Sequence, residues 1–276
     1  MNHKLILLTG VLICSLYISG NCESYCDSLN ENQMQLFTSI QKVFHIPQCS
    51  DMTLESALID SGKCAIASRL SQYGAWLAYL NRDSVYIVNR LAKRNESLSS
   101  PKRYEINEKL FETAGDKNAP VTIAVYISIS CPYCKKICAL LYDLVTAGYL
   151  KGKAKLCVKL LSATDRDMAL LAAHGFKKFW EYMNHISTIK RRLDLDVLIE
   201  AALDLNIPPK AFQNYMENPS VRAHALESRE EGLRNGVKVT PTVFINNRKY
   251  ESHNDPIWII DAVEYEYEQL GKDNSE

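Results

Sequence analysis

Apolar residues in the first third of the chain recur every three or four positions, as they do along one face of an amphipathic helix. The spacing is clear around residues 37–44, in 65–80 and in 85–91. The stretch at 99–103 is polar and contains a proline, which is typical of a linker. The pattern therefore predicts a small all-helical N-terminal region over residues 21–98, followed by a linker at 99–103.

The pattern changes after the linker, because β-branched apolar runs now alternate with helical spacing. Val121–Ile129 is almost wholly apolar, as expected of a central strand that is buried on both faces. A helical pattern covers about 137–145, and a second strand is expected at Lys155–Leu161. Strand, helix and strand in this order predict a βαβ unit, and hence an α/β domain over residues 104–276.

The remainder of this domain is mostly helical in pattern. Helices are expected over about 164–235, and a strand that contains a proline follows at Val239–Ile245. Asn246-Asn247 favours a hairpin turn, and Ile257–Leu270 has the spacing of a final helix. The α/β domain is therefore expected to carry a long helical insertion before its last strands.

Composition and charge exclude several classes of protein. Of the 276 residues, 47% are apolar and 23% are charged, which argues against a disordered or fibrous chain. Lys and Arg number 32, as do Asp and Glu, so the formal net charge is zero. Binding to nucleic acid through phosphates usually needs a basic excess, so no nucleic-acid partner is expected. The histidines show no metal-ligand spacing, and no metal site is expected.

The first twenty residues have the features of a secretory signal. A short basic start at Lys4 precedes an apolar run from Leu5 to Ile18, and small residues follow up to Gly20. The run is shorter than the roughly 20 residues that a membrane span needs. We expect cleavage near Gly20 and a periplasmic or secreted protein. A lipid anchor at Cys22 is the alternative location.

Export changes how the nine cysteines are interpreted, because thiols outside the cytosol tend to be paired. Cys14 would leave with the signal. The mature chain would keep an even number, whose pairing the sequence alone does not fix. These are Cys22, Cys26, Cys49, Cys64, Cys131, Cys134, Cys138 and Cys157.

The chemistry of the chain centres on the motif Cys131-Pro132-Tyr133-Cys134. Its first cysteine ends the buried strand and opens a helix, where free backbone N–H groups and the helix dipole favour a thiolate. Pro132 suits the first helical position, and Cys134 falls close enough to attack a mixed disulfide formed at Cys131. A structural zinc site would need a second comparable pair of ligands, so redox use is favoured over zinc.

Four separated motifs resemble the DsbA-like branch of the thioredoxin superfamily, in the same order. They are Gly115–Ile123, Cys131–Lys136, Phe176–Glu181 and Gly236–Asn246. The resemblance covers about residues 104–272. It implies an α/β thioredoxin fold with a helical insertion at about 164–235, preceded here by the all-helical region.

The same resemblance implies a role for the dipeptide Thr240-Pro241. Pro241 should be cis and should face Cys131, which would place a backbone edge beside the reactive sulfur. An extended substrate would pair with this edge as an added strand. The alternative is an ordinary proline at the start of a strand.

The chain departs from the family near the second cysteine. Members commonly carry an acidic residue six positions before the first cysteine, where this chain has Val125, and often another at the position of Ser128. Lys159, on the next strand, would then be the only charged side chain near Cys134. A solvated residue at the end of a strand is the other interpretation of Lys159.

The N-terminal helices are faintly similar to the thiol-reductase domains of cytochrome c maturation. That domain carries a Cys-x-x-Cys, whereas this chain has Ile46 three positions before Cys49, so the activity is not carried over. A structural disulfide between Cys49 and Cys64, joining two short helices, is the favoured interpretation.

These observations predict an exported thiol–disulfide oxidoreductase. Cys131 and Cys134 would be its catalytic residues, Thr240 and Pro241 would bind substrate, and Pro132, Tyr133 and Lys159 would support the site. No cofactor is expected beyond the redox-active Cys131–Cys134 disulfide. Its partners would be cysteine-containing envelope proteins and a membrane or soluble redox partner. The alternative is a client-binding protein or chaperone for cysteine-rich or cytochrome precursors, with the redox domain as an adaptor.

Overall fold

A computed structural model describes residues 25–60, 63–108 and 112–273. The expected signal at 1–20, with Cys14, and the alternative anchor at Cys22 lie outside these residues. The chain forms two compact units. Of the described residues, one unit comprises those up to Pro101 together with Tyr250–Tyr265, and the other comprises those within Lys102–Lys249 together with those from Glu266 onward.

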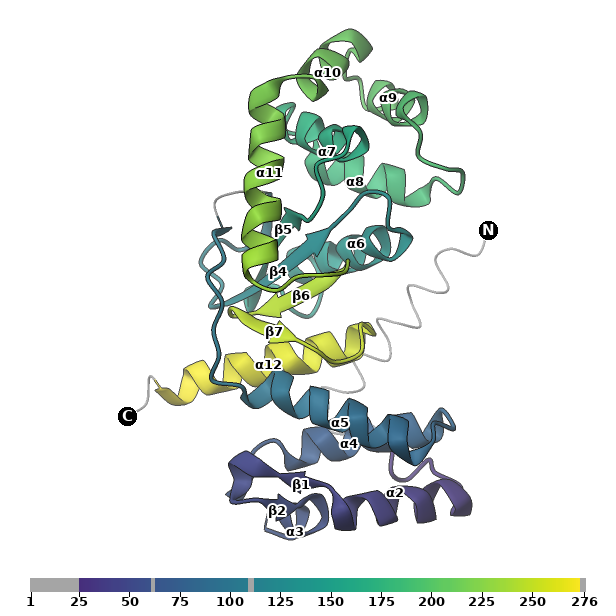
Figure 1. Cartoon of the computed structure of the whole chain (residues 1–276), viewed down its shortest axis with the longest axis vertical. Coiled ribbons are helices and arrows are strands. Elements are labelled where there is room, and N and C mark those ends of the chain that lie inside the picture. The colour runs from purple at the N-terminus through teal and green to yellow at the C-terminus, as the bar shows by residue number, and fades with distance from the viewer. Residues whose placement is uncertain (1–24, 61–62, 109–111, 274–276) are drawn as a thin grey trace. The chain divides into compact units, whose positions relative to one another are not determined.

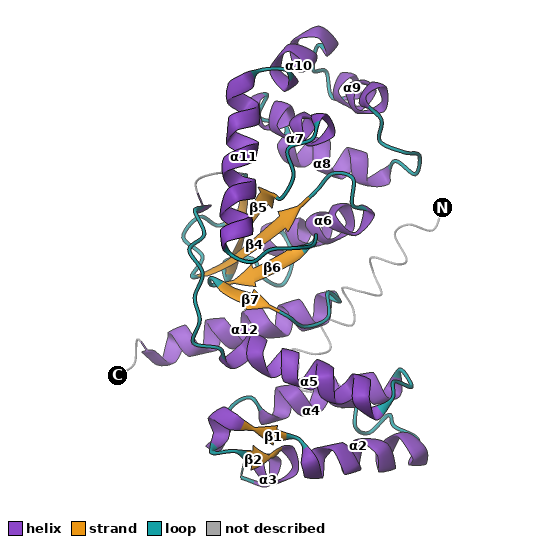
Figure 2. Cartoon of the chain, viewed as in Figure 1, coloured by secondary structure: helices purple, strands orange, loops and turns teal. Residues whose placement is uncertain are grey.

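Helices from the first third of the chain make up most of the described part of the first unit (Figure 2). They are α2 (Glu31–Val43), α3 (Leu54–Ile59), α4 (Ala67–Tyr79) and α5 (Ser84–Ser99). Between α2 and α3 lie β1 (His45–Ile46), the short 3-10 helix η1 (Pro47–Cys49) and β2 (Met52–Thr53). The helices expected from the pattern are therefore present, and the small β1–β2 ribbon is an addition to the expected all-helical region.

Local capping explains where two of these helices begin. The Asn30 side chain accepts a hydrogen bond from the Gln33 N–H, while the Gln33 side chain accepts one from the Asn30 N–H, which is a capping box. Asp83 caps α5 by accepting a hydrogen bond from the N–H of Tyr86.

Helix α2 packs closely against α4, since a Cβ at Gly74 of α4 would lie 2.5 Å from the Phe37 ring of α2. Only glycine fits at this point without displacing that ring.

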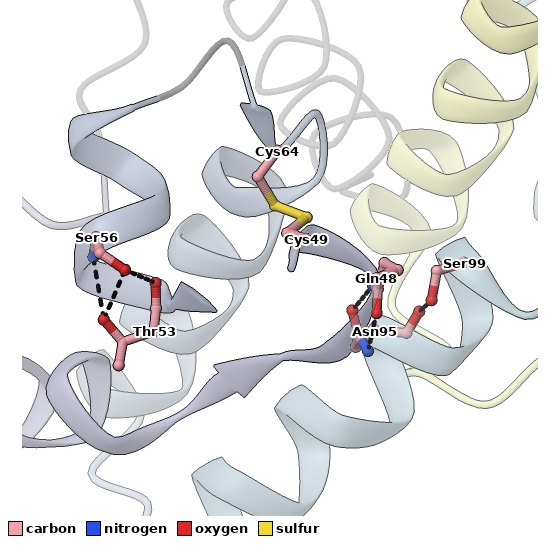
Figure 3. Close-up of a disulfide and its surroundings, with 7 residues drawn as sticks. All are labelled: Gln48, Cys49, Thr53, Ser56, Cys64, Asn95 and Ser99. Carbon is pink, nitrogen blue, oxygen red and sulfur yellow. Dashed lines mark hydrogen bonds between the residues drawn. A yellow bond between two sulfur atoms is a disulfide. The ribbon is translucent and has the colours of Figure 1, made fainter. Parts of the chain in front are cut away.

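The disulfide between Cys49 and Cys64 is present, so this prediction is confirmed (Figure 3). It joins the end of η1 to the segment before α4, and the two Cα atoms are 5.3 Å apart. Nearby, the side chains of Gln48 and Asn95 are hydrogen-bonded to each other, which ties η1 to α5. Both cysteines are buried, as expected of a structural bridge.

The segment Tyr250–Tyr265 differs from expectation, because the sequence placed all of 104–276 in one domain. In the structure this segment packs with the N-terminal helices. The Trp258 ring lies edge-on to Tyr73, with centroids 4.9 Å apart. Arg94 of α5, which is fully buried, donates to the Trp258 carbonyl at 2.8 Å and to the Asp261 carboxylate. The boundary between the units therefore falls inside the last helix, α12 (Pro256–Asp273).

A five-stranded sheet forms the centre of the second unit (Figure 1). Its order is β3-β5-β4-β6-β7, formed by β3 (Thr113–Gly115), β5 (Ala154–Leu160), β4 (Val121–Ile127), β6 (Thr242–Ile245) and β7 (Arg248–Tyr250). Strand β4 pairs parallel with β5 and antiparallel with β6, and each of its residues is buried. The central strand expected from the apolar run is confirmed.

Helices cover both faces of this sheet. The sheet lies between α6 (Pro132–Thr146) and α11 (Pro219–Arg234) (Figure 1). The expected helical insertion is formed by α11 with α7 (Asp165–Gly175), α8 (Phe179–Thr188), α9 (Leu195–Asp204) and α10 (Pro209–Met216). Strand β4, helix α6 and strand β5 form the predicted βαβ unit. Among the described residues, no helix is both long enough and apolar enough to cross a membrane.

Candidate redox site

Cys131 lies in the turn between the central strand β4 and helix α6. It is the N-cap residue of α6, and Pro132 occupies the first helical position. The N–H of Cys131 donates to the carbonyl of Ser128 at 3.0 Å, which closes a turn between strand and helix. The residue is partly exposed and lies at the helix start, where unsatisfied N–H groups favour negative charge.

Cys134 lies one turn into the same helix and has the opposite surroundings. Its N–H donates to the Cys131 carbonyl at 3.1 Å, and only 1% of the residue is exposed. Burial raises the pKa of the Cys134 thiol to about 12, while the backbone at Ser128 opposes this shift and Cys131 adds to it. Both cysteines are thiols in this structure. The pair thus combines an accessible sulfur with a shielded one that resists ionisation.

The peptide bond between Thr240 and Pro241 is cis, as the family resemblance implied. The Cys131 thiol donates to the Thr240 carbonyl at 3.4 Å, so this dipeptide faces the accessible cysteine. Thr242 begins β6, and its hydroxyl donates to the Val239 carbonyl at 2.6 Å, which fixes the loop before the strand. A backbone edge therefore lies beside the sulfur of Cys131.

Two large apolar side chains, one close in sequence to Cys131 and the other next to Thr240, face solvent. Tyr133, in the first turn of α6, is 71% exposed, and Val239, next to Thr240, is 69% exposed. Burying such groups in a complex is favourable. They provide apolar contact area on both segments that meet at Cys131.

Asp167 of α7 supports the site and was not identified from the sequence. Its fully buried carboxylate accepts from the Ile129 N–H at 3.0 Å and from the Ser128 hydroxyl at 3.3 Å. It also accepts from the hydroxyls of Ser162 and Thr164, at 2.7 and 2.6 Å. Asp167 thus fixes the loop that leads into Cys131. The spacing of Thr164 and Asp167 indicates a helix cap, but the contact with residues 128–129 depends on tertiary structure.

Lys159 differs from the sequence interpretation in two respects. It is completely buried, so the interpretation as a solvated residue is wrong. It is also not an isolated charge, because its ammonium lies 2.5 Å from the Glu231 carboxylate and donates to the Asn107 carbonyl at 2.8 Å. Tyr126 donates to the same carboxylate at 2.5 Å.

The register of the sheet explains why Lys159 does not serve the cysteine pair. Lys159 is the partner of Tyr126 in the parallel pairing of β4 with β5, so both side chains point to the face covered by α11. Val125 precedes Tyr126 and points to the opposite face, because side chains alternate along a strand. The largest contributions to the pKa of Cys134 come from burial and from Ser128, Cys131 and Thr240.

The other cysteines fall outside this site. Cys138 and Cys157 are buried thiols, and burial raises the pKa of Cys157 to about 12. The sulfur of Cys26 lies 3.8 Å from the Ser71 hydroxyl, and any pairing with Cys22 lies outside the described residues. Within the described part of the chain, no group of three His, Cys, Asp or Glu side chains is placed to hold a metal ion.

Comparison with known proteins agrees with this geometry. The family model described as thioredoxin matches residues 111–263. Among solved structures, a thioredoxin-like oxidoreductase from Silicibacter pomeroyi DSS-3 is similar, with a TM-score of 0.51 and 20% identity, over 56% of this chain and 91% of that one. BdbD from Bacillus subtilis, in its oxidised form, gives a TM-score of 0.51 and 15% identity, over 60% of this chain and 97% of its own.

A third solved structure extends the likeness to a protein of the DsbA type. The alpha-DsbA1 protein of Wolbachia pipientis gives a TM-score of 0.51 and 14% identity, over 60% of this chain and 94% of its own. No curated protein sequence matches the chain. The structural likenesses establish a fold shared with DsbA-like proteins, and the family match covers more than half of the chain. The chain therefore belongs to the thioredoxin family.

Proposed function

We propose that this protein is an exported thiol–disulfide oxidoreductase that acts through Cys131 and Cys134. The observation that carries the proposal is the asymmetry of the pair. Cys131 caps a helix, is partly exposed and faces the cis peptide bond of Thr240-Pro241, whereas Cys134 is buried behind it. A nucleophile that accepts a substrate and a shielded thiol that resolves the complex need these two environments.

The reduction of a substrate disulfide then takes two exchanges. The Cys131 thiolate attacks one substrate sulfur, which forms a mixed disulfide and releases the other substrate sulfur as a thiolate. Cys134 loses its proton and attacks the Cys131 sulfur, which expels the second substrate thiolate and leaves a Cys131–Cys134 disulfide. The substrate gains two electrons and the pair loses two. The reverse sequence oxidises a substrate dithiol.

The substrate segment is proposed to lie extended along the Thr240-Pro241 edge. Its backbone would pair with this edge in the manner of an added strand, next to the sulfur of Cys131. Tyr133 and Val239 would cover apolar side chains that flank the substrate cysteine. Cysteine-containing envelope proteins fit this mode, because they expose extended segments before their disulfides are complete.

The redox partner of the Cys131–Cys134 pair decides the direction of net electron transfer. A membrane or soluble protein that removes electrons from Cys131 and Cys134 makes the enzyme an oxidase, and one that donates electrons makes it a reductase or isomerase. No additional cofactor is required for the exchanges described above, since both electrons reside in the sulfur atoms.

Client binding is the second candidate function. It is favoured by the raised pKa of Cys134, which slows resolution and prolongs each mixed disulfide, together with the exposed Tyr133 and Val239. In that case the pair would capture cysteine-rich or cytochrome precursors and hold them. Turnover separates the two candidates, because a client-holding protein forms mixed disulfides but does not cycle.

The test is dithiothreitol-driven reduction of insulin by the full chain without residues 1–20. The enzyme proposal predicts catalysed precipitation of the insulin B chain, which Cys131→Ser abolishes. Cys157→Ser is the matched control, because it removes a buried thiol on the α11 face of the sheet and should retain activity. Stoichiometric mixed disulfides without turnover would support client holding instead.

The proposed location has a separate test. Expression of the whole chain in a bacterial host, followed by mass spectrometry of the envelope fraction, should give a new N-terminus near Asn21. A lipid-modified Cys22 would assign the protein to a membrane surface. An intact Met1 on a cytosolic product would contradict export.

A further inference from the structure

Helix α9 of the helical insertion is apolar on two faces. One face is buried within the insertion and comprises Val197, Leu198, Ala201 and Ala202. The other comprises Leu195, Ile199 and Leu203, which follow one another at four-residue spacing and so form a stripe along the helix. Leu195 is 40% exposed and Leu203 is 54% exposed. A helix that is apolar on both faces normally packs on both, and the described residues of this unit leave the second face partly exposed.

The exposed stripe is the floor of a groove between α9 and α10. Two adjoining hollows, of about 280 and 410 Å³, share Asp196, Ile199 and Gln213 as lining residues. Leu195 and Met216 line the first, and Leu203 and Pro209 line the second. We refer to this continuous depression as the α9–α10 groove. It shares no residue with the Cys131 site.

The rim of the groove is acidic. Its four carboxylates are Asp165, Asp196, Glu200 and Glu217, and its two arginines are Arg191 and Arg222. Arg222 pairs with Asp165 at 2.5 Å, and Arg191 pairs with Glu200, so both positive charges are neutralised locally. Asp196 and Glu217 form no side-chain hydrogen bond or ion pair with any other described residue. An apolar floor with two uncompensated carboxylates suits a ligand that is apolar on one side and basic beside it.

We propose that the α9–α10 groove docks a basic amphipathic helix of a partner protein. Apolar anchors at four-residue spacing in the partner would pack between Leu195 and Leu203, and its Lys or Arg side chains would meet Asp196 and Glu217. The two hollows in series along α9 fit a helix better than a compact small molecule, because they present a row of contacts rather than one enclosed chamber.

The charges argue against two other occupants. An anionic membrane surface would be repelled by the rim carboxylates. A second copy of this chain, docked symmetrically, would place Asp196 and Glu217 opposite the same acidic groove. Both alternatives lack the positive charge that the rim requires.

The test is fluorescence anisotropy with a labelled synthetic peptide of about 16 residues, long enough to form a helix. It carries Leu at four-residue spacing and Lys on both sides of this stripe. The full chain without residues 1–20 should bind it, with a dissociation constant in the tens of micromolar. A matched peptide with Glu in place of each Lys should bind at least tenfold more weakly.

Protein variants then assign the binding to the groove. Asp196→Lys combined with Glu217→Lys should weaken binding of the Lys peptide about tenfold and strengthen that of the Glu peptide. Leu203→Ser should also weaken binding of the Lys peptide. The matched controls lie on α11 outside the groove, where Leu226→Ser and Glu227→Lys should leave both affinities unchanged.

Four results would overturn the proposal. The first is the absence of Lys-peptide binding, the second is equal affinity for the two peptides, and the third is equal effects of groove and control variants. The fourth is a dimer in sedimentation velocity that Leu203→Ser dissociates, since this would assign the groove to a second copy. The substituted side chains are exposed, so thermal unfolding and insulin reduction should match the parent protein and verify that each variant is folded.

Discussion

The raised pKa of Cys134 predicts that resolution of a mixed disulfide is slow near neutral pH and accelerates as the pH rises. Only the thiolate attacks. With a pKa of about 12, roughly one Cys134 side chain in 100,000 is ionised at pH 7, compared with roughly one in thirty for an ordinary thiol. The rate of resolution should therefore increase about tenfold for each pH unit between about pH 6 and pH 9.

The cause of this effect persists in the mixed disulfide. Burial is the largest contribution to the shift, and it does not depend on the state of Cys131. The contribution of Cys131 itself disappears once its sulfur is bonded to substrate, so the size of the shift decreases while its direction is unchanged. Val125 stands where related proteins commonly carry an acidic residue, so this position cannot accept the proton of Cys134.

Stopped-flow mixing of the reduced protein with excess dithiobis-nitrobenzoate measures both steps. The first thionitrobenzoate is released when Cys131 attacks, and the second when Cys134 resolves the adduct. Cys134→Ser should retain only the first phase, and Cys131→Ser should lose both. A second phase that is fast at pH 7 and does not change with pH would refute the reasoning, because it would require another route for the proton.

A substitution at Val125 tests the missing proton acceptor directly. Val125→Glu should accelerate the second phase near neutral pH and flatten its pH dependence. Val125→Gln is the matched control, because it introduces a similar side chain that cannot accept the proton. Both variants should cost about 2 kcal/mol or more of stability, since Val125 is completely buried and Lys159 points to the other face of the sheet.

Three further predictions follow from other parts of the structure. At mildly acidic pH, iodoacetamide should modify Cys131 before Cys134, as read by peptide mass spectrometry, and equal labelling would contradict the assigned roles. Cys64→Ser should lower the free energy of unfolding of the first unit by about 3 kcal/mol, since the bridge closes a 15-residue separation, and should leave insulin reduction intact. Asp167→Asn should reduce stability by about 2 kcal/mol and slow the first stopped-flow phase several-fold, because the buried carboxylate holds the loop before Cys131. Asp165→Asn, at an exposed position of the same helix, should change neither quantity by much, and equal effects would exclude a positioning role for Asp167.

Features of the fold that depend on local patterns could be predicted from the sequence. The run Val121–Ile129 is apolar because β4 is buried on both faces, and the helical spacing within 164–235 reflects one buried face in helices such as α8 and α9. The active-site motif is also local, because a strand, two cysteines and a helix follow one another directly. The cis bond before Pro241 came from family resemblance rather than from any local physical signal.

Features that depend on register or on distant contacts could not be predicted in this way. The sequence leaves Lys159 either near Cys134 or in solvent, because its strand follows β4 in the chain, but one residue of register decides which face it occupies. The role of Asp167 requires the start of α7 to lie against residues 128–129. The association of Tyr250–Tyr265 with the N-terminal helices depends on the Arg94 and Trp258 contacts across a long sequence separation.

The reduction potential of the Cys131–Cys134 pair tests the central claim most directly. The protein is equilibrated in glutathione buffers of graded potential, quenched by alkylation and analysed by peptide mass spectrometry. The account predicts a single two-electron transition confined to Cys131 and Cys134, which is retained in Cys157→Ser and lost when either cysteine of the pair is replaced by serine. The account would be contradicted if Cys131 and Cys134 stayed reduced in every glutathione buffer, or if oxidation joined either of them to a third cysteine.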